Sequence, residues 1–248
     1  MSGMFAADLC CSLSLVELEG DNKMTKGEFH IRPIELKDLD HVAGACWEDR
    51  QTQMRLLELQ EILGIGAWEG DACVGQLHCY SVTLTRWDDS NFPGYGRERL
   101  ESWPLGWPLL AAKEKGLEFD KPIWGHACFH VGWTLGAPHA NPKYFGRGIG
   151  TAMLRKSVQW AREHGYAGII AHGGTKAAPA YNMWMGCLPW TTYASMGFEC
   201  VAMEEDGKQL PWWTKNEEQP ELMAQVREAI DAGRGYDELC ARLMLLRF

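Results

Sequence analysis

The sequence predicts an α/β (α+β) fold, in which a central β-sheet is flanked by helices. Three observations predict it. Two apolar runs flank Gly70-Asp71 as a hairpin, a long apolar strand covers residues 123–133, and a glycine-rich turn leads into an amphipathic helix near residues 149–162. With 248 residues and 46% apolar side chains, the chain can bury a substantial core.

The first part of the chain predicts an extension, a strand and two helices. Residues 1–26 show weak patterning and are expected to lie outside the core. Residues 29–34 alternate as a strand, and a helix is expected to begin at Asp38, a candidate N-cap. A second helix should cover residues 51–63 and end at Gly64. Its expected inward residues are Met54, Leu57 and Ile62.

The next part predicts a hairpin and an insertion. Residues 65–69 and 72–80 are the two hairpin strands. Residues 83–122 follow no regular pattern and carry many aromatic residues, among them Trp87, Trp103 and Trp107. We expect an ordered insertion or lid, because insertions beside an active site usually set specificity. The alternative is that these aromatic side chains only pack the loop down.

The strand at residues 123–133 predicts two faces. Ala127, Phe129, Val131 and Trp133 should share one face, and His126, Cys128 and His130 should share the other. His126 and His130 invite a metal site, but at about 3.3 Å per residue they lie about 13 Å apart along a strand. That separation is too large for one ion, so no metal is predicted.

The glycine-rich turn is the strongest functional signal. Residues 145–151 read Phe-Gly-Arg-Gly-Ile-Gly-Thr, and Gly165 caps the helix that follows. Unpaired N–H groups at a helix mouth, with glycines that let an anion approach, predict a phosphate site, and Arg147 can add a charge-assisted contact. No lysine follows as in a Walker loop, and the glycine spacing differs from the dinucleotide fingerprint. A plain glycine-softened helix start remains the alternative.

The last part of the chain is expected to complete the sheet and add helices. The expected strands are residues 166–171, 198–202 and 210–214, and a helix is expected around residues 178–186. Residues 216–248 are predicted to be a helical extension packed on the core. It should contain one helix over residues 220–232 and another from about Tyr236.

These motifs resemble the GNAT family of N-acetyltransferases. Residues 142–150 are similar to its pyrophosphate loop, Arg/Gln-x-x-Gly-x-Gly/Ala, and residues 193–198 are similar to its Tyr-x-x-x-Gly-Phe segment. The likeness covers residues 27–215, with residues 83–122 as an insertion. It implies a mixed, mostly antiparallel sheet with splayed fourth and fifth strands. One departure is Phe145, where the family has Arg or Gln.

The resemblance implies acetyl-CoA as co-substrate, with its pantetheine arm between the splayed strands. Backbone of the fourth strand and the glycine turn should hold it, and Asn182 is a further candidate. The implied cofactor-binding residues are Phe129, Val131, Phe145, Gly146, Arg147, Gly148, Ile149, Gly150, Thr151 and Asn182.

Acetyl transfer to an amine needs a base and an acid. An amine with a pKa of about 10.4 is mostly protonated at neutral pH, and freeing its lone pair costs about 4–5 kcal/mol. His130 is the first candidate for the base, because it would border the thioester and histidine is the usual general base near neutral pH. His126 and Glu69 are the alternative candidates for the base. The alternative interpretation of His130 is a structural histidine whose hydrogen bonds are satisfied within the sheet.

The resemblance assigns the acid to Tyr193, whose hydroxyl can protonate the departing thiolate. A plain core tyrosine is the alternative reading. Cys128 as an acyl carrier is a further alternative, but the family resemblance implies direct transfer without a covalent intermediate.

Composition excludes several partners. A net charge of -9 argues against nucleic acid, whose backbone requires a basic face. The sequence contains no run of about 18 apolar residues, so no membrane span is predicted. No signal peptide is recognisable, and a cytoplasmic protein is therefore expected. Nine cysteines without a Cys-x-x-Cys pair argue for reduced thiols. Cys10-Cys11 is either a metal or redox pair or an incidental neighbour pair.

The acceptor is expected to be a small-molecule amine. Tryptophans near the expected pocket suit an aromatic amine or a cation. The identity of the acceptor, the length of the acyl group and the choice between monomer and homodimer stay open. A non-catalytic acyl-CoA sensor with the same fold is the competing function.

Overall fold

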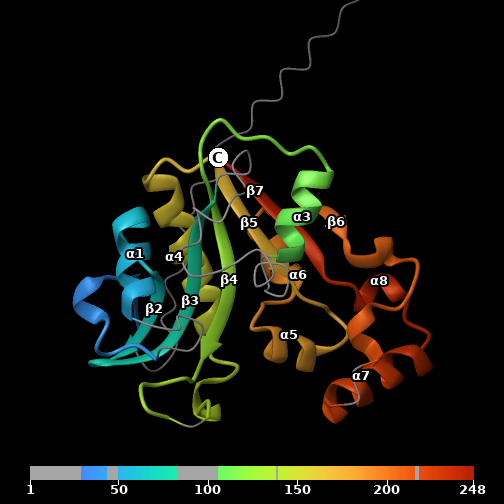
Figure 1. The fold of residues 1–248 in the computed structure, drawn as a ribbon. Coiled ribbons are helices and arrows are strands. Elements are labelled where there is room, and N and C mark those ends of the chain that lie inside the picture. The colour runs from blue at the N-terminus through green and yellow to red at the C-terminus, as the bar shows by residue number, and fades with distance from the viewer. Residues whose placement is uncertain (1–28, 44–49, 83–105, 138, 216–217) are drawn as a thin grey trace, which may run out of the picture.

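The computed structural model describes residues 29–43, 50–82, 106–137, 139–215 and 218–248. They form a seven-stranded sheet in the order β1-β2-β3-β4-β5-β7-β6 (Figure 1). Neighbouring strands are antiparallel except β4 and β5, which pair in parallel. The predicted mixed, mostly antiparallel sheet is confirmed.

The strands are β1 His30–Ile34, β2 Gly64–Glu69, β3 Ala72–Val82, β4 Ile123–Val131, β5 Gly168–Gly173, β6 Glu199–Met203 and β7 Arg242–Arg247. The helices are α1 Arg50–Gln60, α3 Gly106–Glu114, α4 Ile149–Glu163, α5 Pro179–Met185, α6 Trp190–Ala194, α7 Pro220–Asp231 and α8 Tyr236–Leu239.

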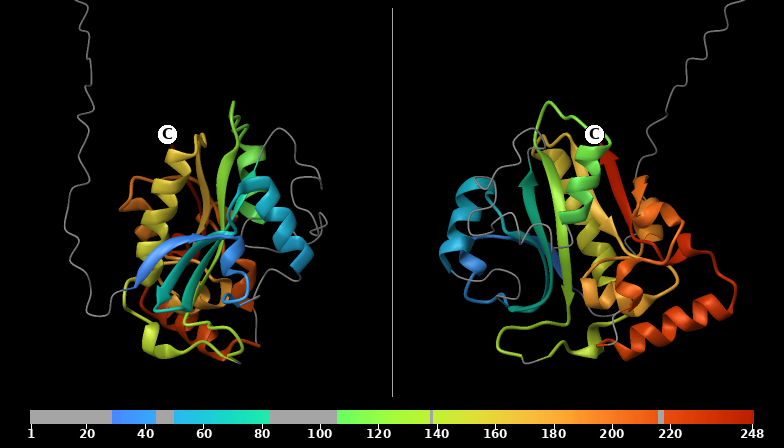
Figure 2. Two further views of the ribbon diagram at one scale, coloured as in Figure 1. Left: turned by 90° about the vertical axis from the view of Figure 1, so that its left-hand side faces the viewer. Right: turned by 45° about the vertical axis from the view of Figure 1, so that its right-hand side comes forward.

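Helices cover both faces of the sheet (Figure 2). On one face, α4 buries Met153 and Leu154 in a core that includes Trp124 of β4. On the other face, α1 and α3 contribute Leu56 and Leu109 to a second core. A third and smaller core joins α5, α7 and α8 at the β6 and β7 side of the molecule. The sheet therefore has a face covered by α4 and a face covered by α1 and α3.

The expected helix at Asp38 is wrong, because this residue ends a short 3-10 helix, Leu36–Asp38. Its side chain turns inward and accepts two hydrogen bonds from the Arg32 guanidinium, at 2.6 and 2.8 Å. It also accepts the backbone N–H of Glu35 at 2.9 Å. The carboxylate thus joins β1 to the turn that follows it. Burial alone would raise the pKa of Asp38, but the bonds from Arg32 and Glu35 lower that pKa below its ordinary value.

Asp38→Asn should destabilise the fold by about 1–3 kcal/mol at neutral pH, because it removes one partner from a largely buried ion pair. Since the folded-state pKa is depressed, the stabilisation is present above the unfolded pKa of about 4 and is lost as pH falls through the folded value. Urea unfolding at neutral and acid pH checks both statements. The variant should show a flatter acid limb than the wild type. Parallel acid limbs would contradict the role of this pair.

The helix α1 is shorter than expected and differs in its buried face. It ends at Gln60, and Gly64 begins β2 rather than ending the helix. A Cβ at Gly64 would lie 2.0 Å from the carbonyl oxygen of Leu77, so only glycine permits this strand approach. Met54 is exposed, contrary to expectation, whereas Gln60 is buried. The Gln60 amide donates to the carbonyls of Ile62 and Cys79, so a polar side chain takes a core position.

A bulge between β3 and β4 decides which side chains share a face. His78 pairs with Cys128 and Cys79 pairs with His126, so Ala127 is an extra residue on β4. The extra residue interrupts the alternation. His126 faces α4, while Cys128 lies in the core under α1 and α3. The predicted common face of His126, Cys128 and His130 is therefore wrong. The predicted opposite face is also divided, because Ala127 and Phe129 lie in different cores.

The predicted separation of the fourth and fifth strands is confirmed. β4 and β5 pair only from Trp124 to His126, although β4 continues to Val131. Beyond that point the chain after α5 lies between them. The N–H of Phe129 donates to the carbonyl of Gly186 at 2.6 Å, and the N–H of Gly174 donates to that of Leu188 at 2.8 Å.

The C-terminal part differs most from expectation. Residues 210–214 are not a strand, since a 3-10 helix covers Trp212–Lys215. The expected last helix is only α8, and β7 follows it between β5 and β6. Residues 216–248 are thus not a helical extension alone. Leu243 and Met244 are buried in the cores on opposite faces, so β7 is apolar without alternation and is indistinguishable from a helix by periodicity.

Most of the expected insertion, residues 83–105, lies outside the described residues, as does the expected extension at 1–26. The helix α3 is the described part that follows. Among the helices that the structure describes, none is long and apolar enough to cross a membrane.

Candidate active site

The glycine-rich turn forms an open cradle at the mouth of α4. Gly146 and Gly148 have φ values of +68° and +74°, and a Cβ on either would meet nothing within 4 Å. Gly148 is the N-cap of α4, so the unpaired N–H groups of the first helical turn follow it directly. Left-handed backbone of this kind favours glycine and leaves the approach to those N–H groups clear. The cradle fits an anion such as a phosphate.

The residues before the turn anchor it to the sheet. A 3-10 helix covers Pro142–Tyr144, and Asn141 caps it by accepting the N–H of Lys143 at 3.1 Å. The Tyr144 hydroxyl donates to Glu69 of β2 at 2.8 Å, and the Lys143 ammonium lies 3.3 Å from the same oxygen. These contacts lower the pKa of Glu69, with the Tyr144 hydrogen bond as the largest cause. Glu69 therefore holds the loop, which makes it a poor candidate for the catalytic base.

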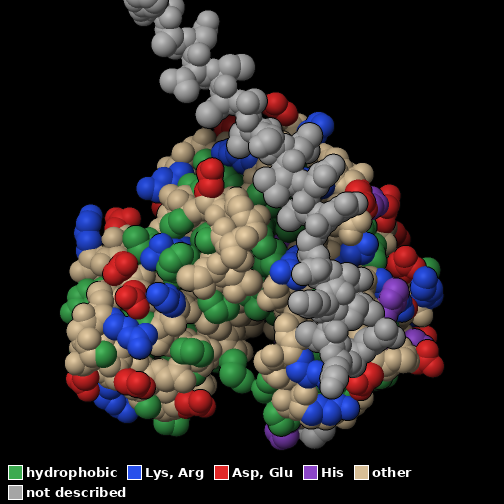
Figure 3. Space-filling model, turned by 180° about the vertical axis from the view of Figure 1, so that it is seen from behind, with side chains coloured by type: hydrophobic (Ala, Val, Ile, Leu, Met, Phe, Trp, Pro, Cys, Tyr) green, Lys and Arg blue, Asp and Glu red, His purple; other side chains and the backbone are tan. Residues whose placement is uncertain are grey.

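A cavity of about 520 Å³ extends from this cradle to the gap between β4 and the chain after α5. All the predicted cofactor-binding residues line it: Phe129, Val131, Phe145, Gly146, Arg147, Gly148, Ile149, Gly150, Thr151 and Asn182. The sequence reading missed Trp133, Ala140, Tyr144, Met183, Gly186, Cys187 and Leu188, which also line it. Figure 3 shows the molecule hollowed between its two halves, with hydrophobic side chains beside the hollow.

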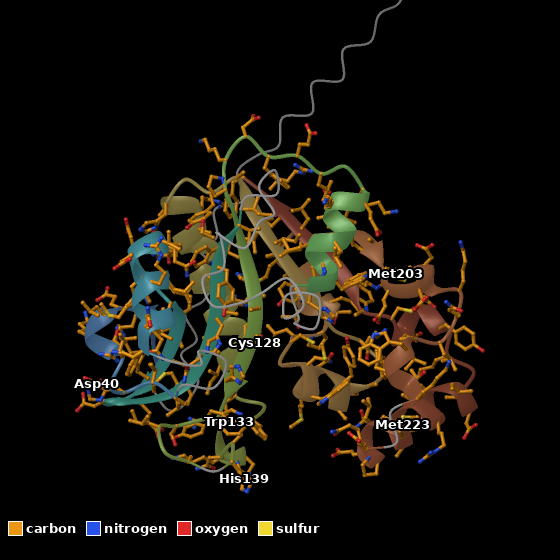
Figure 4. The ribbon with its side chains drawn as sticks, in the orientation of Figure 1. Asp40, Cys128, Trp133, His139, Met203 and Met223 are labelled. Carbon is orange, nitrogen blue, oxygen red and sulfur yellow. The ribbon has the colours of Figure 1, made fainter. Side chains whose placement is uncertain are left out.

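The inner end of the cavity lies where β4 leaves β5. Because the Phe129 N–H already donates to Gly186, that donor is engaged within the protein. Alternate residues of a strand direct their N–H groups to the same side, so the Val131 N–H faces the cavity side as well. Trp133 lies beyond the end of β4 and also lines the cavity (Figure 4).

Asn182 has a structural role in addition to lining the cavity. Its side-chain nitrogen donates to the carbonyl of Thr175 at 2.8 Å, and the Cys187 thiol donates to its oxygen. A Cβ at Gly174 would collide with this amide. The amide thus ties α5 to the turn after β5. If Asn182 also contacts a ligand, it does so while it keeps these hydrogen bonds within the protein.

His130 lies on the face covered by α1 and α3, beside two side chains that the sequence did not connect with each other. Its Nε2 is 3.0 Å from the Cys128 sulfur, and Nδ1 of His78 on β3 is 3.4 Å from the same sulfur. His78 and Cys128 are buried, whereas His130 is half-buried. The sequence does not reveal that His78 pairs with Cys128 across the two strands. Only the register of β3 against β4 shows this pairing.

Tyr193 lies behind the cavity wall. It is 1% exposed and shares a core with Phe129 and Ile149, which line the cavity, but it is not itself part of the lining. Burial raises its pKa well above the ordinary value, so the hydroxyl keeps its proton at neutral pH. The structure does not bring Tyr193 and His130 together, because His130 lies on the opposite face of β4.

His126 lies near Tyr193, with ring centroids 6.4 Å apart. It is buried, its Nε2 lies 2.8 Å from the Ser157 hydroxyl of α4, and burial lowers its pKa to about 3. A neutral histidine in this position fills the core and is a weak candidate for the base. A second pair that the sequence reading missed is His172 with Tyr181, whose hydroxyl lies 3.0 Å from Nε2.

These features coincide with a known family. Residues 34–187, more than half of the chain, match the model of the acetyltransferase (GNAT) family. The chain belongs to the GNAT acetyltransferase family. Members are acyltransferases that use acetyl-CoA, so this GNAT chain is an acyltransferase with acetyl-CoA as co-substrate. No curated protein sequence matches it.

Several solved structures are similar to this GNAT protein in fold. NAA60 of Arabidopsis thaliana, in complex with acetyl-CoA, is 14% identical with a TM-score of 0.41, over 89% of this chain and 100% of that one. A mosquito arylalkylamine N-acetyltransferase like 5b is 12% identical with a TM-score of 0.46, over 88% and 100%. The Drosophila melanogaster polyamine N-acetyltransferase is 10% identical with a TM-score of 0.47, over 89% and 100%.

Tyr144→Phe should weaken acetyl-CoA binding about 2–10-fold, because the loop loses one of its hydrogen bonds to β2. Calorimetry with acetyl-CoA measures this effect. Glu69→Ala should behave alike, and Glu69→Gln should be milder, since its amide oxygen still accepts the hydroxyl. If Glu69→Ala instead slowed transfer at unchanged affinity, the anchoring role would be wrong and the base role for Glu69 would return.

Proposed function

We propose that this GNAT enzyme moves an acetyl group from acetyl-CoA directly to the amine of a small molecule. One observation carries the proposal: the open N–H cradle at Gly146 and Gly148 and the gap between β4 and β5 line a single cavity. An anionic group at the cradle and an extended arm in the gap match the pyrophosphate and the pantetheine arm of acetyl-CoA. When bound, acetyl-CoA supplies a thioester whose carbonyl carbon accepts the amine.

The N–H groups at the start of α4 bind phosphate oxygens in this proposal. The helix dipole adds only about 0.3–1 kcal/mol, so directed N–H bonds provide most of the binding. Arg147, at the cavity edge, adds positive charge. Phe145 is 39% exposed and has no polar side chain. In this proposal the backbone N–H groups therefore bind the phosphate without the arginine or glutamine side chain that the family pattern has at this position.

His130 accepts the proton that the amine must lose. It lies on the face of β4 opposite the α4 core, so the amine would approach from the side of α1 and α3. The proposal therefore requires the amine to reach the thioester where β4 separates from β5, since His130 is not part of the cavity lining. Direct attack needs the two reactants to be held in contact at that point.

Tyr193 donates its proton to the departing sulfur. Its raised pKa keeps the hydroxyl protonated, which an acid requires. The role requires that the hydroxyl reach the inner end of the cavity beside Phe129, with which it shares a core. Cys128 is a weaker candidate for an acyl carrier, because it is buried and does not line the cavity.

A non-catalytic acyl-CoA sensor is the second candidate. The observation that favours it is the bond between the Phe129 N–H and Gly186, which occupies a backbone donor that the pantetheine arm was expected to use. A protein that binds acetyl-CoA without placing the thioester correctly would act as a sensor.

Release of CoA from acetyl-CoA, measured by chromatography with a panel of amines, tests the proposal. The panel should contain an arylalkylamine, agmatine, a polyamine and a peptide with a free N-terminus. Amine-dependent release together with the acetylated product supports the enzyme. Calorimetric binding of acetyl-CoA without release for any amine supports the sensor. None of the six cysteines that the structure describes forms a disulfide, which suits the reducing cytoplasm as the place of action.

We also propose that the insertion closes over the acceptor. Trp107 on α3 packs on the core at the same face as His130, edge-on to His172 at 5.8 Å. Trp107→Ala should raise the Michaelis constant for the amine roughly 10-fold, a loss of about 1.4 kcal/mol, and leave acetyl-CoA affinity unchanged. Trp103→Ala should act in the same direction.

Trp212→Ala is the matched control, because this tryptophan is 59% exposed and lies outside the cavity lining. Steady-state kinetics in both substrates separates the outcomes. A loss confined to acetyl-CoA affinity, or an equal loss in both through unfolding, would overturn the lid.

A further inference from the structure

Three side chains converge between β3 and β4, on the face covered by α1 and α3. Cys128 and His130 are two residues apart on β4, beyond the bulge, and therefore share a face. His78 pairs directly opposite Cys128. One ligand atom from each residue lies within 4.8 Å of the other two. Two paired strands hold the side chains, so the arrangement is set by the sheet rather than by a loop. Cys128 lies midway along β4 (Figure 4).

The separations approach those of a metal coordination sphere. Bonds of about 2.3 Å from zinc to sulfur and about 2.0–2.1 Å to nitrogen give tetrahedral edges of about 3.4–3.6 Å. The Cys128 sulfur lies 3.4 Å from Nδ1 of His78 and 3.0 Å from Nε2 of His130. The two imidazole centroids are 4.7 Å apart. The two ligating nitrogens lie within 4.8 Å of each other and would have to approach to about 3.3–3.4 Å to share one tetrahedral ion.

Gln76 supports the orientation of His78. Its side chain is fully buried and lies 3.2 Å from Nε2 of that ring. With the amide nitrogen toward the ring, Gln76 also bonds both backbone groups of Ala43, and His78 then carries its proton on Nδ1, toward the sulfur. With the amide oxygen toward the ring, Nε2 carries the proton and the Nδ1 lone pair faces the sulfur. Ligation through Nδ1 therefore requires the Gln76 amide to turn its oxygen toward the ring, which gives up both bonds to Ala43.

We propose that His78, Cys128 and His130 form a binding site for a divalent transition metal of the zinc class. One thiolate and two neutral imidazoles suit borderline and soft ions and not magnesium or calcium, which prefer oxygen ligands. On binding, the sulfur–hydrogen bond of Cys128 breaks, a sulfur–metal bond forms, and one proton leaves to solvent. No electron is transferred. Half-buried His130 provides the side from which an ion enters.

Cobalt(II) is the probe, because a cysteine thiolate bound to it gives a near-ultraviolet charge-transfer band that oxygen and nitrogen ligands do not. The reduced, chelator-treated full chain should develop that band with one equivalent of cobalt, and zinc should abolish it. Release of one proton per zinc ion in weakly buffered solution is the second readout. Cys128→Ser should eliminate the band. His130→Gln, at a half-buried and more tolerant position, should weaken cobalt affinity at least about 10-fold.

Two controls separate this site from other thiols. Cys79→Ser removes a buried cysteine of β3 that faces Ser157 on the opposite side of the sheet. The double variant Cys10→Ser, Cys11→Ser removes the adjacent cysteines near the N-terminus. Both should keep the band. A band that survives Cys128→Ser, that disappears in the double variant, or that never forms in folded wild-type protein would overturn the proposal.

Metal binding would occupy a nitrogen of His130, which is also the proposed base. Zinc should then slow acetyl transfer in the wild type, and this consequence rests on the proposed function. The cobalt titration does not rest on it. A chain that transfers no acetyl group would still show the band, whereas an active chain without the band would lack the metal site.

Discussion

Acetyl-CoA binding should be lost or weakened at least about 10-fold when Gly148 is replaced by valine. The residue has a φ of +74°, where an L-residue costs about 1–2 kcal/mol and a β-branched one more. Its Cβ would meet no protein atom and would therefore enter the space beside the N–H groups of α4. Strain and obstruction act together at the expected phosphate position, and 1.4 kcal/mol already corresponds to tenfold in affinity. Calorimetry with acetyl-CoA measures the loss.

Gly165→Val is the matched control at the other end of α4. Gly165 has a φ of +73°, and a Cβ there also meets nothing within 4 Å, but it does not line the cavity. Both variants should lose similar stability in urea unfolding, and only Gly148→Val should lose acetyl-CoA binding. Equal affinity in the two folded variants would show that the cradle does not hold the cofactor.

Tyr193→Phe should slow acetyl transfer by about 10²–10⁴-fold, the usual contribution of a general acid. The ring stays in its core and only the proton donor is removed, so the fold and the acetyl-CoA affinity should change little. Single-turnover measurements are the appropriate test, because slow product release can hide a change in the chemical step.

Tyr181→Phe controls for the removal of a buried hydroxyl. This tyrosine is also 1% exposed, and its hydroxyl bonds His172 rather than lying in the core beside Phe129. Its transfer rate should stay within a few-fold of the wild type. An unchanged single-turnover rate in Tyr193→Phe would remove the acid role, and equal slowing in both variants would reduce it to a general effect of core polarity.

The local features of the site could be predicted because their signals are local. Gly148, the N-cap of α4, adopts a left-handed conformation that few other residues adopt. The spacing of the apolar residues in α4 determines which side of the helix packs on the sheet. The hairpin around Gly70 follows the same logic. All the predicted cofactor-binding residues line the cavity for this reason, because most of them lie in one uninterrupted turn.

Apolar periodicity misled where polar residues are buried or where both faces are covered. Gln60 occupies a core position because its amide satisfies two carbonyls, which no hydropathy pattern reveals. The run from Arg242 to Arg247 suggested a helix, since leucine and methionine favour helices. Its place between β5 and β6 makes it a strand, because each hydrogen-bonding edge of those strands needs a partner.

Local signals in the sequence predict the glycine cradle and the helix behind it, and the family resemblance implies the split between the fourth and fifth strands. Which histidines meet depends instead on how the strands pair. The extra residue Ala127 turns His126 toward α4, and the register of β3 against β4 brings His78 to Cys128, fifty positions away. Side chains in a sheet alternate with period two, so one inserted residue reassigns every face beyond it. Such an insertion depends on pairing with another strand, and therefore it leaves no mark in the strand's own sequence.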